Sequence, residues 1–255
     1  MIVADRPFRT LLTREVLRFT RIWVQTLIPS LLTSLLYLVV FGLALGARIK
    51  QIEGIPYLEY ILPGVALMNL VTGSQMNSSW SVFDAKRERY IDEVLIAPMS
   101  DMQIALAYSL GGTLRGVMMG AGVLLVGAPF VGVSIAHPGL LLVIGVLSAF
   151  TFSALGTMVG ALATRVEHSS FLANVVIQPL AFLGGVFYSV GMLPEAVRVA
   201  TLFNPIFYTV DAARYATLEV SDLNPYPTLA VVFLLAVLAF CGAWWAIHRG
   251  PNLRY

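Results

Sequence analysis

Residues 228–247 read TLAVVFLLAVLAFCGAWWAI, twenty consecutive positions without one charged side chain. An α-helix crosses the hydrocarbon core of a bilayer with roughly 20 apolar residues. Five further runs reach this length, at residues 27–46, 61–83, 104–130, 140–163 and 171–189. The sequence therefore predicts an all-α membrane protein with six transmembrane helices in a single domain, residues 1–255.

The composition excludes several other classes of protein. Hydrophobic residues make up 58% of the 255 positions, charged residues 12%, and the mean hydropathy is +0.82. Soluble domains carry about 25% charged residues. This chain therefore has too few charged residues to cover the surface of a soluble globule in which the apolar runs are buried core helices. The net charge of +2 argues against a nucleic-acid partner, and the single cysteine, Cys241, forms no intrachain disulfide.

The segment before the first span, residues 1–26, has helical periodicity. We expect an amphipathic helix in the headgroup layer, with its apolar face toward lipid and its arginines toward phosphate. A simple positive flank of the first span is the alternative, and no cleaved leader is expected. The apolar positions are Phe8, Leu11, Leu12, Val16 and Phe19, and the arginines between them are Arg9, Arg14, Arg18 and Arg21.

The distribution of basic residues predicts the orientation. With the amino terminus inside, the inner segments carry eleven Lys and Arg residues and the outer segments four, while Arg115 lies within a span. Basic residues are enriched on the cytoplasmic side of membrane proteins. Both termini are therefore expected in the cytoplasm.

Two connections are long enough to carry function. The inner segment 84–101 holds eight charged residues and predicts a short amphipathic helix that ends at Pro98. The outer segment 190–227 is apolar but broken by four prolines, and residues 195–203 and 206–218 each suit a short helix. We expect a re-entrant or surface-lying helical pair, because irregular backbone at membrane depth must be shielded from lipid.

Several kinds of chemistry have no counterpart in the sequence. A Walker A loop ends in Gly-Lys-Ser or Gly-Lys-Thr, whereas the only two lysines follow Ile49 and Ala85. The three histidines are isolated, so no metal site is expected. All 14 acidic residues lie outside the six runs, which argues against a proton- or sodium-coupled carrier. The chain is expected to be no enzyme itself, and energy for any transport must come from elsewhere.

Polar residues within the spans allow two interpretations. They form helix–helix hydrogen bonds, or they line a path through the membrane. Arg115 lies eleven residues into the third span, where it must snorkel, reach a carboxylate in residues 84–101, line a cavity, meet an anionic substrate, or simply sit in the inner leaflet. The polar group in the second span comprises Asn69, Thr72, Ser74, Gln75, Asn77, Ser78 and Ser79.

Glycines mark close packing and one bend. Small residues recur every four positions on the third span and on the fourth, a spacing that lets helix backbones approach closely. The consecutive Gly184 and Gly185 favour a bend near the outer end of the fifth span. The packing glycines are Gly112, Gly116, Gly120, Gly156 and Gly160.

Two stretches resemble the transmembrane subunits of ABC exporters of the type-2 (ABC-2) class. Residues 182–194, FLGGVFYSVGMLP, are followed by LFNP at 202–205 and YTVDAARY at 208–215. Residues 86–98, KRERYIDEVLIAP, are similar to the family's charged cytoplasmic segment. The beginning at residues 21–27 and the end at residues 249–254 look like the YadH/NodJ-type branch of that family.

This resemblance implies a mechanism and its partners. Two permease copies, as a homodimer, would pair with two ABC ATP-binding subunits that carry ATP and Mg²⁺, in the inner membrane of a bacterial cell. The cargo would be an amphiphile such as a lipid, a lipid-linked glycan or a drug, and a non-transporting scaffold or regulatory subunit is the alternative. Residues 84–101 would be the coupling segment that docks on the ATPase, and residues 190–227 would gate the exit.

The resemblance and the polar pattern together assign three groups of candidate residues. Coupling to the ATPase subunit is expected from Arg14, Arg87, Glu88, Arg89 and Glu93. The substrate path is expected at Asn69, Gln75, Asn77 and Arg115. The outer gate is expected at Gly184, Gly185, Phe187, Tyr188, Pro194, Asn204 and Pro205.

Overall fold

The computed structural model describes residues 5–44, 46 and 48–250, and the end of the expected closing motif at residues 249–254 lies outside them. The fold is helical apart from one short antiparallel hairpin, β1 (Gln51–Ile52) with β2 (Ile55–Pro56). The first helices are α1 (Asp5–Thr20), α2 (Trp23–Ala44), α3 (Tyr57–Arg87), α4 (Ile91–Ile96), α5 (Asp101–Val131) and α6 (Pro138–Leu162). There follow α7 (Val166–Phe171), the π-helix η1 (Leu172–Ile177), α8 (Gln178–Leu183), the 3₁₀ turn η2 (Val190–Met192), α9 (Glu195–Thr201), α10 (Pro205–Leu218) and α11 (Pro225–Arg249).

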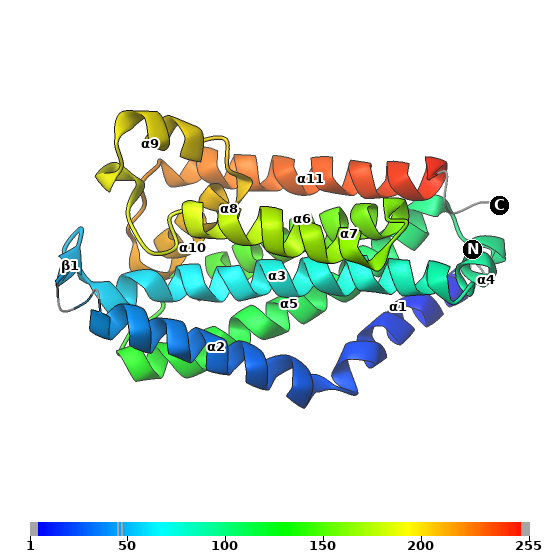
Figure 1. Cartoon of the computed structure of the whole chain (residues 1–255), viewed down its shortest axis with the longest axis horizontal. Helices are drawn as coiled ribbons and strands as arrows, with labels where there is room; N and C mark the ends of the chain where they lie inside the picture. The colour runs from blue at the N-terminus through cyan, green and yellow to red at the C-terminus, as the bar shows by residue number, and fades with distance from the viewer. Residues whose placement is uncertain (1–4, 45, 47, 251–255) are drawn as a thin grey trace.

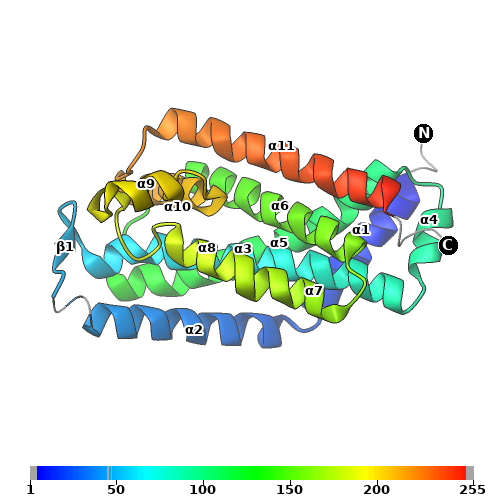
Figure 2. The ribbon, with the colours of Figure 1, turned by 45° about the horizontal axis from the view of Figure 1, so that its top comes forward.

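The long helices run along one common direction, with α3 in the middle (Figure 1). Helices α5 and α6 pack on α3, α11 packs on α6, and α2 covers α3 and α5 from another side (Figure 2). Helix α4 and the ends of α1 and α11 lie at one end of the bundle, whereas the hairpin, α9 and α10 lie at the other. We call these the docking end and the hairpin end.

Helical segments occupy all six ranges in which the sequence predicts spans. By length and composition, four of the described helices can cross a membrane: α2, α5, α6 and α11. Helix α3 is 31 residues long but carries the polar group of the second run, which α5 and α6 shelter. The all-α class is therefore confirmed.

The fifth segment differs from the predicted range 171–189. Its helix begins at Val166 and ends at Leu183, and the chain then turns through Gly185 at φ +76°. That conformation is readily adopted only by glycine, so the predicted bend is confirmed while the predicted end at residue 189 is wrong. The π-helical stretch precedes Pro179, where the Gln178 N–H bonds to Ala173 O, five residues back. Proline lacks an N–H, and the wider register accommodates this loss.

The small residues on α5 and α6 serve close packing against α3. A Cβ atom at Gly112 would lie 2.0 Å from Ser78 Oγ, and one at Gly156 would lie 2.3 Å from the backbone oxygen of Gln75. No real side chain fits at these distances. The predicted packing role is therefore confirmed at both positions.

Helix α1 is amphipathic, but its apolar face contacts protein instead of lipid. Leu11 and Phe19 are 5% and 4% exposed, and Leu11 joins a buried cluster with Val82 of α3 and Ile91 of α4. The expectation of an apolar face turned toward the bilayer is therefore wrong. Periodicity alone finds such a face, and only tertiary packing decides what covers it.

Candidate docking face and lateral groove

Helix α4 presents a charged surface at the docking end. Ile91 and Val94 are buried beneath it, while Asp92 and Glu93 are exposed. Its last residue is followed by Ala97 in extended conformation and then Pro98. The predicted amphipathic helix is present, although it is shorter than the segment 84–101 because α3 and α5 extend into both ends of that range.

Helices α1 and α4 are linked by a cation–π contact and share a groove. The guanidinium of Arg14 lies 4.0 Å above the ring of Tyr90, the residue before α4. A groove of about 370 Å³ between the two helices is lined by both Arg14 and Glu93. The structure therefore brings these two predicted coupling residues to one site.

The other three predicted coupling residues lie at the turn between α3 and α4. Arg87 Nη2 is 3.1 Å from Asp84 Oδ1 and 3.2 Å from Glu88 Oε1, and Arg89 has φ +60°. All three side chains, Arg87, Glu88 and Arg89, are exposed. We call this turn, the exposed face of α4 and the adjoining groove the docking face.

Lys86 fixes the docking face to α6. Its Nζ donates hydrogen bonds to the carbonyl oxygens of Gly160, Ala161 and Ala163, at 3.2, 2.7 and 2.6 Å. These carbonyls belong to the end of a helix, where a cation is favourable. Burial lowers the pKa of Lys86 to about 8, so the ammonium is still mostly protonated at neutral pH. No pattern in the sequence indicates this contact.

The middle of α1 is held by a buried carboxylate. Glu15 is fully buried and accepts hydrogen bonds from Ser81 Oγ at 2.5 Å and from Arg18 Nη2 at 3.2 Å. Arg18 Nη2 also lies 3.0 Å from both the backbone and side-chain oxygens of Asn77. The sequence signal for Glu15 was its spacing of four residues from Leu11 and from Phe19, which places it on the apolar face.

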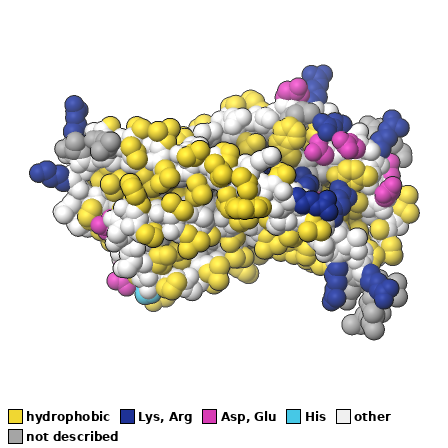
Figure 3. Space-filling model, turned by 90° about the horizontal axis from the view of Figure 1, so that it is seen from below, with side chains coloured by type: hydrophobic (Ala, Val, Ile, Leu, Met, Phe, Trp, Pro, Cys, Tyr) yellow, Lys and Arg dark blue, Asp and Glu magenta, His cyan; other side chains and the backbone are white. Residues whose placement is uncertain are grey.

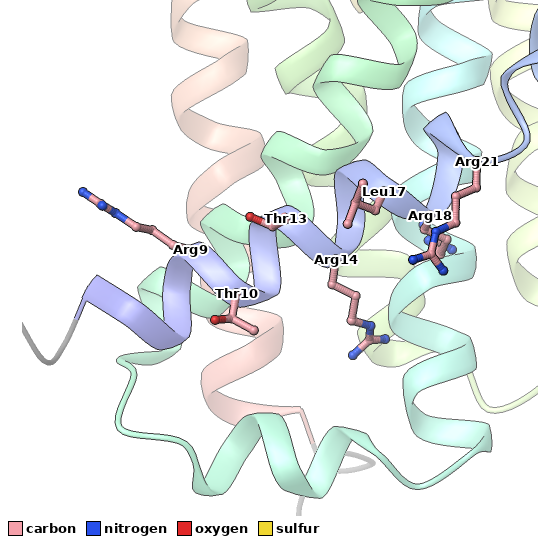
Figure 4. Close-up of a pocket in the computed structure, with 7 residues that line it drawn as sticks. All are labelled: Arg9, Thr10, Thr13, Arg14, Leu17, Arg18 and Arg21. Carbon is pink, nitrogen blue, oxygen red and sulfur yellow. The ribbon is translucent and has the colours of Figure 1, made fainter.

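The opposite side of α1 is hollowed and lined with arginines. A hollow of about 590 Å³ is lined by residues of α1 and by Arg21, which follows that helix (Figure 4). Arg9 points away from the bundle, whereas Arg18 turns inward toward α3. Of these two arginines, it is Arg18 that contacts the buried side chains of Glu15 and Asn77.

A lateral groove of about 430 Å³ lies between α2, α3, α5 and α8. Asn69, Thr72, Arg115 and Gln178 supply polar atoms to its wall. Arg115 Nη1 donates to Asn77 Oδ1 at 3.3 Å, so Asn77 lies directly behind the wall. The structure thus places Arg115 at a cavity, one of the outcomes that the sequence allowed.

The remaining polar residues of α3 divide between the two interpretations. Ser78 bonds across helices to Tyr108 O at 3.1 Å and Ser153 Oγ at 2.6 Å. Asn69 lines the groove and also bonds to Ser34 on α2 at 2.8 Å. Gln75 is fully buried against α6 and does not line the groove.

The residues predicted as an outer gate cluster at the hairpin end. Phe187 is buried and stacks on Phe41 of α2, with ring centroids 4.3 Å apart. Asn204 caps α10 by accepting from the Ile206 N–H at 3.0 Å, and its Nδ2 donates to Leu180 O at 2.6 Å. The Asn-Pro pair therefore joins α10 to the end of α8.

Four further gate candidates surround this cluster, whereas the fifth lies apart from it. Gly184 approaches Ile206 closely, and Gly185 forms the turn that leads to Phe187. Tyr188 is half-buried, and Pro205 is the first residue of α10. Pro194 is exposed and caps α9 instead.

A charged network in the same region was missed as a site. Arg214 is 1% exposed, donates to Gly185 O at 2.5 Å and lies 3.6 Å from Asp222 Oδ2. Its guanidinium also lies 4.0 Å above the ring of Tyr60. Asp211, one turn earlier, is fully buried and accepts from the Asp222 N–H at 2.7 Å. The spacing of Asp211 and Arg214 on an otherwise apolar helix was the available signal.

These features define a multi-pass helical membrane protein with a charged docking face at one end and a closed cluster at the other. The family model of the ABC-2 type transporter matches residues 6–218. The chain therefore belongs to the ABC-2 type transporter family.

Named relatives agree with this membership. The chain is 35% identical over 246 residues to the inner membrane transport permease YadH of Escherichia coli K12, covering 96% of each protein. It is 24% identical over 207 residues to nodulation protein J of Rhizobium meliloti, covering 79% of this chain and 77% of that one. Nodulation protein J of Sinorhizobium fredii is also 24% identical, over 225 residues. The chain is thus a transport permease subunit.

Proposed function

We propose that this chain is the permease subunit of an ATP-driven exporter in a bacterial inner membrane. Two copies would pair, and each would dock a separate ATP-binding subunit that holds ATP and Mg²⁺. Family membership and the docking face support this proposal. The observation that carries it is the α1–α4 unit, which exposes charge while its apolar side is fixed to the bundle.

The proposal includes six membrane passes with both termini in the cytoplasm. The four apolar helices would be joined by α3 and by the composite α7–η1–α8 segment. Helix α3 crosses with its polar residues turned toward neighbouring helices and the lateral groove. The excess of basic residues in the inner segments supports the orientation.

Helix α3 offers a mechanical path from the docking face to the gate cluster. It has 31 residues and is therefore about 46 Å long. At the docking end it leads into α4, and Lys86 fixes it to α6. At the hairpin end, the Tyr57 hydroxyl donates to Phe187 O at 3.1 Å. Closure of the ATP-binding subunits would displace α4, and α3 would transmit that displacement to the gate.

The cargo class that suits the structure is an amphiphile. The lateral groove combines an arginine and amides with the side chains of Met68, Met76 and Met119. Flexible methionines adapt to apolar ligands of irregular shape. An amphiphile could enter such a groove sideways from the bilayer.

Charge reversal on the docking face tests the coupling. The complex of permease and ATP-binding subunit would carry a dye at position 198 on α9, introduced as Arg198→Cys in a Cys241→Ser background. ATP should change the dye signal, and Glu93→Arg should abolish most of that change while hydrolysis continues. Glu167→Arg is the matched control, because Glu167 is exposed on α7 outside the docking face.

Two outcomes would contradict the proposal. An unchanged ATP-dependent signal in Glu93→Arg would remove the docking face from the coupling path. A signal that never responds to nucleotide, with no ATPase partner bound, would favour the alternative of a non-transporting scaffold or regulatory subunit.

A further inference from the structure

Two arginines from different helices converge on one amide. Arg18 of α1 and Arg115 of α5 both donate to Asn77 Oδ1 of α3, at 3.0 and 3.3 Å. Like charges so close together repel, and an amide oxygen offers only a partial negative charge in return. The arrangement therefore suits an additional anion.

The charges near this point do not balance within the described part of the chain. Glu15 forms an ion pair with Arg18 and also accepts from Ser81. No carboxylate of the described residues forms an ion pair with Arg115. One positive charge is left over beside the groove.

Three N–H donors at this point have no acceptor among the described residues. They are Arg18 Nε, Asn77 Nδ2 and Arg115 Nε, and all three atoms are buried. An unpartnered buried donor costs about 1–3 kcal/mol, so three on side chains that meet at Asn77 favour an acceptor with several oxygens. A tetrahedral phosphate has this form, and guanidinium groups bind it with paired hydrogen bonds.

The position of the cluster relative to the apolar surface indicates the rest of the ligand. Arg115 lines the lateral groove, whose α2 side includes Pro29 and Thr33. Farther along α2, Leu32 and Leu36 are 62% and 61% exposed. On this face of the molecule, most Lys and Arg side chains lie at one end of a wide apolar belt, and a few project from the other end (Figure 3).

We propose that Arg115, Arg18 and Asn77 bind the phosphate of an anionic amphiphile whose apolar chain lies along the lateral groove. The claim that this amphiphile is the transported cargo rests on the proposed transport function. Binding of the amphiphile to this site does not require ATP. Phosphate in a lipid headgroup and free inorganic phosphate share the chemistry, and the groove favours the lipid.

A binding measurement on the full chain in dodecyl maltoside micelles, without nucleotide or ATPase subunit, tests the site. The probe is a fluorescent short-chain phosphatidic acid, followed by anisotropy. Arg115→Gln keeps a donor for Asn77 but loses the charge, and should weaken binding about tenfold. Asn77→Asp supplies an internal anion between the arginines and should also weaken binding at least about tenfold, with the fold intact.

Arg249→Gln is the charge-matched control, since Arg249 is exposed at the same end of the bundle on α11. Its affinity should stay within about twofold of the parent protein. An equal loss in this control would reduce the effect to general surface charge and overturn the site.

Two competition arms distinguish the ligand. A phosphatidylcholine probe that binds as tightly as phosphatidic acid would overturn the preference for an exposed anionic phosphate. Inorganic phosphate that competes as well as dodecyl phosphate would overturn the role of the groove. Because no ATPase subunit is present, failure here would leave the coupling proposal untouched, and failure of coupling would leave this binding unchanged.

Discussion

Arg214 and Arg115 show two ways of placing an arginine in an apolar bundle. Arg214, at the hairpin end, has a carbonyl, a carboxylate and an aromatic face around its guanidinium, and is 1% exposed. Arg115, toward the docking end, has one amide oxygen and the wall of a groove. Both arginines keep buried donors without a hydrogen-bond acceptor, Nε and Nη1 of Arg214 and Nε of Arg115. The charge of Arg214 is paired with Asp222, whereas no carboxylate in the described part of the chain pairs with Arg115.

Arg214 therefore carries a structural charge, whereas the charge of Arg115 is available to a ligand. Removing one partner of a buried ion pair leaves the other charge without compensation, which is strongly destabilising. Removing a charge that has no partner ion lowers the unfolding free energy only slightly. The two arginines should therefore respond very differently to the same kind of substitution.

The largest effect is expected for Arg214→Met. It leaves Asp222 near Asp211 without a cation and removes the bond to Gly185 O, at an expected cost of about 3–5 kcal/mol in unfolding free energy. Thermal unfolding in detergent should show Tm lowered by roughly 10 °C. A Tm near that of the parent protein would mean that the network at the hairpin end is not structural.

A smaller, pH-dependent effect is expected from Asp211. Burial raises the pKa of this carboxyl to about 6, despite the Asp222 N–H and Arg214 beside it. The folded protein then holds this proton more tightly than the unfolded chain, so the stabilisation is lost as pH rises through 6. Glu53 and Asp222 are the other titratable groups in this network.

Asp211→Asn provides the comparison, since its amide oxygen can still accept from Asp222 but cannot ionise. Between pH 5 and 7.5, Tm of the parent protein should fall relative to this variant, by on the order of 2 °C. A constant difference across that range would show that Asp211 does not titrate there.

The smallest stability effect is expected for Arg115→Gln. Glutamine can still donate to Asn77, and no ion pair is lost, so the unfolding free energy should change by less than about 1 kcal/mol. Tm measured beside that of Arg214→Met gives the comparison directly. A loss as large as that of Arg214→Met would show that Arg115 is a structural residue.

The sequence predicted the helices well because apolar runs of bilayer length admit few alternatives. It also placed the α4 helix, the Gly184–Gly185 turn and the two short outer helices. The charged contacts, in contrast, could not be predicted from the sequence. In the sequence, Arg214 is one basic residue within the predicted short helix 206–218, and only the fold brings Gly185, Tyr60 and Asp222 around it.

The function of Arg115 could not be resolved from the sequence for a similar reason. Its neighbour Arg18 lies 97 positions earlier, on a helix whose apolar face could have met lipid or protein. Once α1 packs on α5, both arginines reach Asn77. Contacts between distant helices depend on this packing, which periodicity does not reveal.

If our proposal is right, this permease works only with a separate ATP-binding subunit. The most direct measurement is purification of the full chain from native membranes into lipid nanodiscs, followed by identification of bound subunits and an assay of ATP hydrolysis. We expect a bound polypeptide with a Walker A lysine, and ATP hydrolysis that the permease alone lacks. Transport of an amphiphile by the isolated chain, or the absence of any nucleotide-binding companion, would contradict it.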